Sequence, residues 1–204
     1  MFESKKELEL FVEKLPVFKR PKLRLEQYPT DAPLVAAAVW DAYMRGLLTE
    51  VLDLGCGTGR FSLAAAAMGA RRVLCIDIDP EAIQIAKEAA EDLGLGAVDF
   101  LVADATRLWL GRSFAVVFQN PPFGIWSGRG SDIAFLQTAL RHGEVVYTIH
   151  KLPTLNYVSA KAEELGGVLK VLERAVITIK PMYRHHRKRL HKVEVFLAVV
   201  RRKA

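Results

Sequence analysis

The spacing of apolar residues changes near residue 50, from helical periodicity to short runs that alternate with helices. Before that point, apolar residues at helical spacing predict an amphipathic helix over 4–15, and Ser4 is placed to cap it. A second helix is predicted to follow, with Thr30 or Asp31 as its N-cap. The chain therefore begins with a helical extension ahead of the alternating region.

Beyond residue 50, apolar strands alternate with amphipathic helices. Strands are predicted at 51–54, 72–77, 98–102, 114–118, 145–149, 169–179 and 193–200, and helices at 61–68, 80–93, 131–141 and 155–165. Strands joined by helices form parallel sheets that helices cover on both faces. No helix separates the last two strands, so we expect that pair to be antiparallel. The pattern predicts an α/β fold with a seven-stranded, mostly parallel sheet, an antiparallel final strand and helices on both faces.

The composition agrees with this prediction. A chain of 204 residues with 51% hydrophobic and 25% charged residues can bury one core, so we expect a single domain over 1–204 with 1–46 as its extension. No apolar run is long enough for a membrane span and no secretion signal is visible, so a cytoplasmic location is expected. Cys56 and Cys75 are too few for a disulfide framework or a four-thiolate zinc site, and no metal site is expected.

The net charge of +6 is unevenly distributed. Residues 1–24 hold seven Lys or Arg against four Glu, and residues 180–204 hold nine against one, so the centre of the chain is acidic. An acidic centre between basic ends is typical of a core that binds a small ligand and a periphery that meets a polyanion. The alternative is that these cations only keep the surface hydrated.

The first predicted strand leads into a glycine-rich loop, Asp53-Leu54-Gly55-Cys56-Gly57-Thr58-Gly59. Glycines between a strand and a helix let a ligand approach the backbone. Asp77 ends the second predicted strand and Asp104 follows the third, so all three acids should lie at one sheet edge. A single acid there is usually a helix cap or a hydrated carboxylate, but three at successive strand ends predict a nucleoside site. Asp77 is placed for ribose hydroxyls. The Cys56 backbone should matter more than its thiol, and Cys75 should be core.

The fourth predicted strand ends in Gln119-Asn120-Pro121-Pro122-Phe123-Gly124. The exocyclic amine of adenine is a poor nucleophile, because its lone pair is conjugated with the ring. The Asn120 side-chain oxygen and the Pro121 carbonyl could accept its two N–H groups, and the prolines would fix the carbonyl direction. Phe123 could stack on the purine. These residues predict methylation of a planar amine; the alternative is a proline-rich turn.

The D-x-G-x-G-x-G loop and the N-P-P-F motif resemble S-adenosylmethionine-dependent methyltransferases of the Rossmann-like class. Together with the segments 25–30, 147–151 and 183–188, they resemble the methyltransferase-like protein five family over about residues 22–200. The resemblance implies methylation of adenosine N6 in small-subunit ribosomal RNA. It implies catalysis by Asn120, Pro121, Pro122 and Phe123, and S-adenosylmethionine held by Gln27, Tyr28, Thr30, Asp53, Gly55, Cys56, Gly57, Asp77, Ile78, Asp104, Ala105 and Asn120.

In this resemblance Asp104 would contact the adenine amino group of the cofactor, and Gln27, Tyr28 and Thr30 would cover the cofactor as a lid. One departure is Ile125, where eukaryotic members usually have threonine. Two other functions stay open. One is a protein glutamine-N5 methyltransferase, which uses the same tetrapeptide, and the other is a non-catalytic RNA-binding subunit with this fold.

The resemblance also implies a partner, a small zinc-binding activator protein that adds to a sheet edge. The predicted strand 98–102 is a candidate for this edge, because its apolar residues would be a liability if exposed. The alternative is that another part of the chain covers them.

A cationic segment joins the last two predicted strands. It contains Lys180, Tyr183, Arg184, Arg187, Lys188, Arg189 and Lys192. Clustered like charges repel one another, which favours a polyanionic partner such as the RNA backbone, with Tyr183 stacking on a base. The alternative is a hydrated, charged turn.

Overall fold

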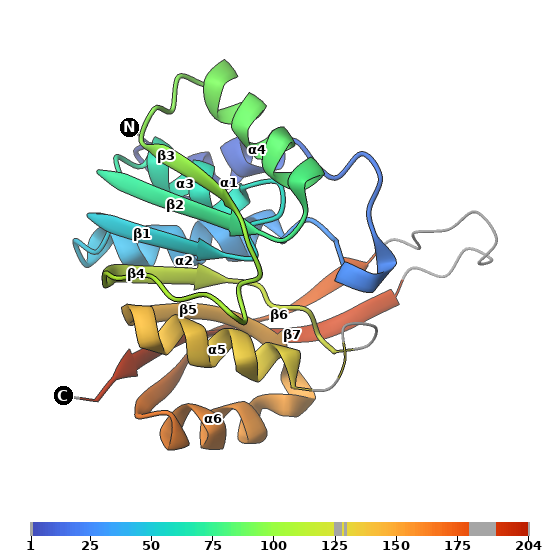
Figure 1. Cartoon of the computed structure of the whole chain (residues 1–204), viewed down its shortest axis with the longest axis vertical. Helices are drawn as coiled ribbons and strands as arrows, with labels where there is room; N and C mark the ends of the chain where they lie inside the picture. Colours follow the sequence, from blue (N-terminus) through green and yellow to red (C-terminus); the bar gives the residue numbers. More distant parts are fainter. Residues whose placement is uncertain (1, 125–127, 129, 180–190, 204) are drawn as a thin grey trace.

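The computed structural model describes residues 2–124, 128, 130–179 and 191–203. One seven-stranded sheet runs through it in the order β3-β2-β1-β4-β5-β7-β6 (Figure 1). The strands are β1 (Glu50–Leu54), β2 (Arg72–Asp77), β3 (Val98–Val102), β4 (Phe114–Gln119), β5 (Gly143–Lys151), β6 (Gly167–Ile179) and β7 (His191–Arg202). β1 to β5 pair in parallel, whereas β7 is antiparallel to both β5 and β6. This confirms the predicted sheet.

Helices cover both faces of the sheet (Figure 1). They are α1 (Lys5–Glu13), α2 (Ala32–Met44), α3 (Arg60–Ala67), α4 (Pro80–Asp92), α5 (Ser131–His142) and α6 (Leu155–Glu164), with short 3-10 turns η1 (Leu23–Leu25) and η2 (Leu152–Thr154). α1 to α4 pack in one apolar core and α5 and α6 in the other. In the central strands β1, β2, β4 and β5, alternate residues enter opposite cores, as the pleat requires. On β5, for example, Tyr147 enters the first core and Val146 the second.

Local chemistry explains where several helices begin. The Ser4 hydroxyl accepts a hydrogen bond from the Glu7 backbone N–H at 3.2 Å, which confirms the predicted cap of α1. Ser131 and Asp132 have side chains that often cap helices, but in α5 both lie inside the helix, and Gly130 is its N-cap. Gly130 precedes them with φ +85°, a left-handed conformation that glycine adopts without strain.

The β6–β7 pair is longer at both ends than predicted. Its ladder continues to Ile179 opposite His191, so Lys192 lies in β7 opposite Thr178 and not in a loop. The prediction of a loop at that position was wrong, because backbone pairing extends further than the apolar pattern indicates. The other cationic positions lie outside the described residues: Lys180, Tyr183, Arg184, Arg187, Lys188 and Arg189.

The parallel strands position the candidate site. The carboxyl ends of β1 to β4 meet at one edge of the sheet, on the right in Figure 1. The glycine loop, Asp77, Asp104 and Asn120 each follow or end one of these strands. Among the helices that the structure describes, none combines the length and apolar character that crossing a membrane requires.

Candidate cofactor and catalytic site

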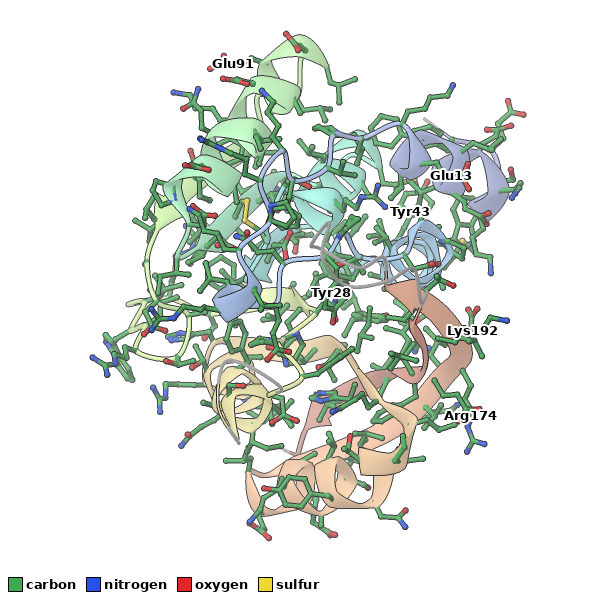
Figure 2. All side chains as sticks on the ribbon, turned by 90° about the vertical axis from the view of Figure 1, so that its right-hand side faces the viewer. Glu13, Tyr28, Tyr43, Glu91, Arg174 and Lys192 are labelled. Carbon is green, nitrogen blue, oxygen red and sulfur yellow. A yellow bond between two sulfur atoms is a disulfide. The ribbon has the colours of Figure 1, made fainter. Side chains whose placement is uncertain are left out.

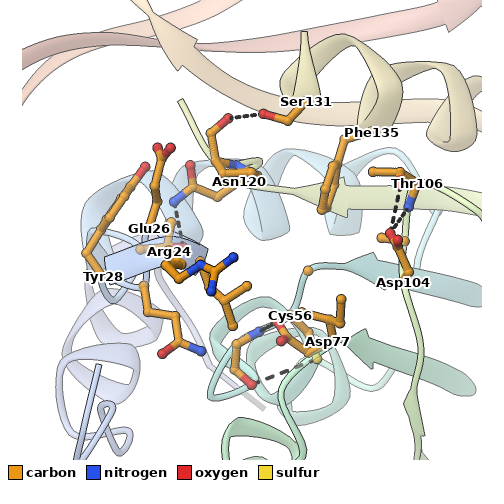
Figure 3. A pocket seen from close by; sticks show the side chains of 18 of the residues that line it. Arg24, Glu26, Tyr28, Cys56, Asp77, Asp104, Thr106, Asn120, Ser131 and Phe135 are labelled. Carbon is orange, nitrogen blue, oxygen red and sulfur yellow. Dashed lines mark hydrogen bonds between the residues drawn. The ribbon is translucent and has the colours of Figure 1, made fainter. Parts of the chain in front are cut away.

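A cavity of about 520 Å³ lies at the carboxyl ends of β1 to β4 (Figure 3). The predicted site residues that line it are Gln27, Tyr28, Thr30, Gly55, Cys56, Gly57, Asp77, Ile78, Asp104, Ala105, Asn120 and Pro122. Asp53, Pro121 and Phe123 are not among its lining residues. The fold therefore brings the N-terminal segment, residues 16–31, against the loops that follow four different strands.

The glycine loop folds back over β2. The N–H groups of Gly55 and Cys56 both donate to the Ile76 carbonyl, at 2.8 and 2.9 Å. Gly55 and Gly57 have φ values of +69° and +56°. A Cβ atom on Gly55 would lie 2.8 Å from the Phe135 ring, and one on Gly57 would lie 2.8 Å from the Phe18 ring. The loop is thus a tight backbone surface that larger side chains would block.

Cys56 and Cys75 form a disulfide, with their Cα atoms 5.6 Å apart. Cys75 was predicted to be core, and it is fully buried. The prediction ranked the Cys56 backbone above its thiol and did not include this bond between the two sulfur atoms. The pairing arises because Cys75 lies on β2, next to the strand that the glycine loop follows. The bond ties the cofactor loop to β2, which restricts both to one arrangement.

Two of the predicted acids are held by neighbouring backbone and side-chain donors. Asp77 accepts from the Gly57 N–H at 2.8 Å and from the Asp79 N–H at 2.9 Å. Burial raises the pKa of Asp77, and these backbone hydrogen bonds oppose that rise. Asp104 accepts from the N–H and the hydroxyl of Thr106, at 2.9 and 2.7 Å. Both carboxylates are therefore held in one orientation at the cavity wall.

The third acid, Asp53, lies behind the glycine loop. One of its oxygens accepts from the Ser62 N–H at 2.9 Å and from the Ser62 hydroxyl at 2.6 Å. Its other oxygen is buried without a hydrogen-bond partner among the described residues. Burial raises the pKa of Asp53 to about 7, and the bonds from Ser62 oppose the rise. In this arrangement Asp53 joins β1 to α3.

The N-terminal segment is fastened to the start of α4. Gln27 donates to the Asp79 carboxylate at 2.7 Å and accepts from the Lys22 N–H at 2.7 Å, and the Lys22 ammonium lies 2.6 Å from the same carboxylate. The Lys22 and Gln27 bonds lower the pKa of Asp79, although its burial opposes them. The Thr58 hydroxyl adds a bond to the Pro16 carbonyl at 2.8 Å. The side-chain amide of Gln27 therefore bonds to other residues of the protein through both its oxygen and its nitrogen.

Asn120 is oriented by the N-terminal segment. Its Nδ2 donates to the Thr30 hydroxyl at 3.1 Å, and its Oδ1 is buried with no hydrogen-bond partner among the described residues. Thr30 and Asn120 are 90 positions apart in the chain, so only the folded arrangement brings them together. Asn120 lines the cavity, and the bond to Thr30 leaves its buried oxygen as an acceptor that no described residue uses.

Phe123 packs beside this site. Its ring is 9% exposed and lies 5.6 Å from the Tyr28 ring, between centroids. The Lys151 ammonium lies 5.8 Å from the Phe123 centroid. His150 is buried and shares a 2.8 Å hydrogen bond with the Thr148 hydroxyl. Stacking of Phe123 on a purine would therefore require Tyr28 or the ring itself to move.

Several lining residues were missed by the sequence analysis. They include Phe18, Arg24, Glu26, Arg60, Thr106, Ser131 and Phe135. Glu26 carries one local signal, its place beside Gln27 and Tyr28, and in the structure it is buried with a left-handed φ of +50°. The others come from elements whose approach depends on packing.

The comparisons agree with the geometry. A family model described as a methyltransferase domain matches residues 51–143. Protein MJ0284 of Methanocaldococcus jannaschii is 36% identical over 95% of this chain and 92% of its own. The rRNA N(6)-adenosine-methyltransferase Mettl5 of Drosophila melanogaster is 32% identical over 93% of this chain and 92% of its own. The crystal structure of PH1948 from Pyrococcus horikoshii superposes with a TM-score of 0.86, at 32% identity over 100% of both chains.

Fold and site together define a Rossmann-like methyltransferase that uses S-adenosylmethionine. Within that class, the chain belongs to the methyltransferase-like protein five family. The residues present fit the cofactor: the glycine loop offers a close backbone approach, and Asp77 and Asp104 offer acceptors for hydroxyl and amino groups. Because the cofactor brings its own electrophilic methyl group, the protein mainly binds and orients.

Replacing Asp77 with alanine should weaken the binding of S-adenosylmethionine about 10- to 100-fold. The change removes the carboxylate that accepts from the Gly57 N–H and the predicted acceptor for the ribose hydroxyls. Calorimetric titration measures this change. Asp92→Ala, at the exposed end of α4, is the matched control and should leave the dissociation constant unchanged. An unchanged constant for Asp77→Ala would remove Asp77 from the site.

The pKa of Asp53 predicts a pH-dependent stability. Since the folded pKa is about 7 against an ordinary 3.8, the folded protein keeps a proton that the unfolded chain releases between these values. Raising the pH from about 4 to about 7 should therefore lower the free energy of unfolding by a few kcal/mol in cofactor-free protein. Asp53→Asn should lose the contribution of Asp53 to this decrease and keep that of Asp77, whose pKa is also raised. Urea unfolding of both proteins across this range measures the difference, and parallel curves would contradict the prediction.

Proposed function

We propose that this protein methylates the N6 amino group of an adenosine in ribosomal RNA of the small subunit, in the cytoplasm. The similarity to Drosophila Mettl5, whose name describes adenosine N6 methylation of rRNA, supports the reaction. The observation that carries the proposal is the Asn120 amide, which lines the cavity: Thr30 orients it, and its buried oxygen has no hydrogen-bond partner among the described residues.

In this mechanism Asn120 and Pro121 prepare the amine for attack. The Asn120 oxygen accepts one N–H of the adenine amino group, and the Pro121 carbonyl accepts the other. Two such bonds favour a pyramidal nitrogen, whose lone pair is no longer conjugated with the ring and can attack the methyl group. Because the fold already holds both acceptors in place, they need no rearrangement during the reaction. S-adenosylmethionine, when bound, supplies the electrophilic methyl group.

The surrounding residues hold this pair in place. Pro121 and Pro122 restrict φ, and Pro122 also accepts from the Ser131 hydroxyl at 3.5 Å. Burial, to which the Glu26 charge adds, raises the pKa of Tyr28, which keeps this residue neutral beside Asn120. We assign Phe123 to the flipped purine, with Tyr28 moving away from the ring as the base enters.

We further propose that residues 1–46 act as the cofactor lid of one methyltransferase domain over 1–204. The bonds from Gln27, Lys22 and Thr58 support this role, because they hold residues 16–31 over the glycine loop. Gln27 would act by fastening the lid at Asp79. Tyr28 and Thr30 line the cavity and are positioned for the cofactor itself.

RNA would be held by the cationic segment and by the β6–β7 hairpin, whose strands it joins in the sequence. Arg174 on β6 and Lys192 on β7 are exposed and point outward on this hairpin (Figure 2). We assign phosphate contacts to Lys180, Arg184, Arg187, Lys188, Arg189 and Lys192, and base stacking to Tyr183. Such contacts give affinity that does not depend on RNA sequence.

A small zinc-binding activator protein is proposed as a partner at the β3 edge. Leu101 and Val102 are 38% and 50% exposed, and β2 is the only strand that pairs with β3 in the described part of the chain. An added strand would satisfy the free backbone groups of this edge. We expect Leu101→Lys with Val102→Lys to abolish co-purification of that protein. Val168→Lys with Val176→Lys, on the opposite edge strand β6, is the matched control. Co-expression that yields no complex for the unaltered chain would contradict the proposal.

The substrate is tested by methyl transfer from labelled S-adenosylmethionine. Deproteinised small-subunit rRNA, large-subunit rRNA and a release-factor protein serve as parallel acceptors. We expect label only in small-subunit rRNA, recovered as N6-methyladenosine by nucleoside mass spectrometry. Label in large-subunit rRNA would refute the choice of subunit, and label on protein glutamine would establish the alternative activity.

Asn120→Ala checks the mechanism in the same assay. The loss of one preorganised acceptor should slow methyl transfer about 100- to 1,000-fold, by analogy with oxyanion-hole groups, with little change in cofactor affinity. Asn156→Ala, exposed on α6, should react at the normal rate. Near-normal turnover by Asn120→Ala would refute its assigned role.

A further inference from the structure

Five charged side chains line the cavity: Arg24, Glu26, Arg60, Asp77 and Asp104. The two aspartates follow β2 and β3, at one end of the row of strand ends, whereas Asn120 follows β4 at the other. S-adenosylmethionine has a single anionic group, the carboxylate of its methionine part. An anion removed from water requires a cation or several N–H donors, so the two arginines are the groups to compare.

Arg60 is positioned by the glycine loop and by the N-terminal segment together. It is the first residue of α3 and directly follows Gly59. Its guanidinium donates to the Thr30 carbonyl at 2.8 Å, and the Thr30 hydroxyl accepts from Asn120. Thr30 thus links Arg60 to the side chain that faces the methyl acceptor, away from the adenosine end of the site.

The guanidinium of Arg60 has binding capacity that the described residues do not use. Its Nε is buried with no hydrogen-bond partner among them. In the described part of the chain, no carboxylate forms an ion pair with Arg60 either. Leaving a charged N–H buried without an acceptor is costly, which points to a ligand.

Burial lowers the pKa of Arg60, while the charges of Asp31 and, to a smaller extent, Glu13 oppose that change. An arginine remains charged in such surroundings. The N-terminal end of α3 adds a favourable field for an anion at the same place.

We propose that Arg60 binds the carboxylate of the methionine part of S-adenosylmethionine, through the guanidinium edge that Thr30 leaves free. This inference rests on cofactor binding and does not depend on the methyl acceptor. Arg24 is exposed at the cavity mouth, where Figure 3 shows it between Glu26 and Asp77. An ion pair at such an exposed position contributes little, so Arg24 provides the matched control.

The experiment compares two ligands that differ only in this carboxylate. Calorimetric titration measures the dissociation constants of S-adenosylmethionine and decarboxylated S-adenosylmethionine for the unaltered chain, Arg60→Gln, Arg60→Lys and Arg24→Gln. We expect the unaltered chain to prefer the carboxylate ligand about 10- to 100-fold, as a charged hydrogen bond allows. In Arg60→Gln this preference should fall to about twofold or less, through weaker binding of S-adenosylmethionine alone.

Arg60→Lys should restore part of the preference, because it keeps the charge without the planar fork. Arg24→Gln should retain all of it. The proposal fails if the unaltered chain binds both ligands equally, a measurement that needs no variant. It also fails if Arg60→Gln weakens the binding of both ligands alike, because Arg60 would then act only by positioning Thr30. It fails equally if Arg24→Gln is the variant that loses the preference. Binding of neither ligand by the unaltered chain would instead overturn the cofactor assignment.

Discussion

Parallel pairing of β1 with β2 on one side and β4 on the other is the constraint on which the site depends. Because parallel strands end at the same edge, loops that are far apart in the sequence meet there in the order of the strands. This order places Asp104 and Asp77 at one end of the cavity and Asn120 at the other. S-adenosylmethionine carries its nucleoside at one end and its reactive methyl group further along the molecule. A site that binds it needs nucleoside-binding groups at one end of the cavity and groups that face the methyl acceptor at the other.

The N-terminal segment completes the site from outside the sheet. Its attachment at Asp79 uses one carboxylate for three tasks: it caps α4 through the Glu81 N–H, accepts from Gln27 and pairs with Lys22. With this attachment in place, Thr30 reaches Asn120 and Arg60. The positions of Asn120 and Arg60 are therefore coupled, because both side chains bond to Thr30 of this segment.

Burial raises the pKa values of two acids at the site. Asp53 and Asp77 have raised pKa values because water is excluded from them, and the hydrogen bonds from Ser62, Asp79 and Gly57 offset part of that cost. The disulfide between Cys56 and Cys75 holds the same loop from its other side. The result is a rigid backbone surface on which a ligand needs little rearrangement to bind.

The sequence by itself determined the architecture and the reaction class. The apolar patterns predict each strand and helix from neighbouring residues. The motifs D-x-G-x-G-x-G and N-P-P-F are likewise short, continuous stretches of sequence, each at the end of one predicted strand. The tertiary structure alone decided which side chains share the cavity. Asp53 lies behind its wall, Gln27 bonds Asp79, and Arg60 meets Thr30. These relations could not be predicted, because they depend on distances between elements that packing sets and local sequence does not record.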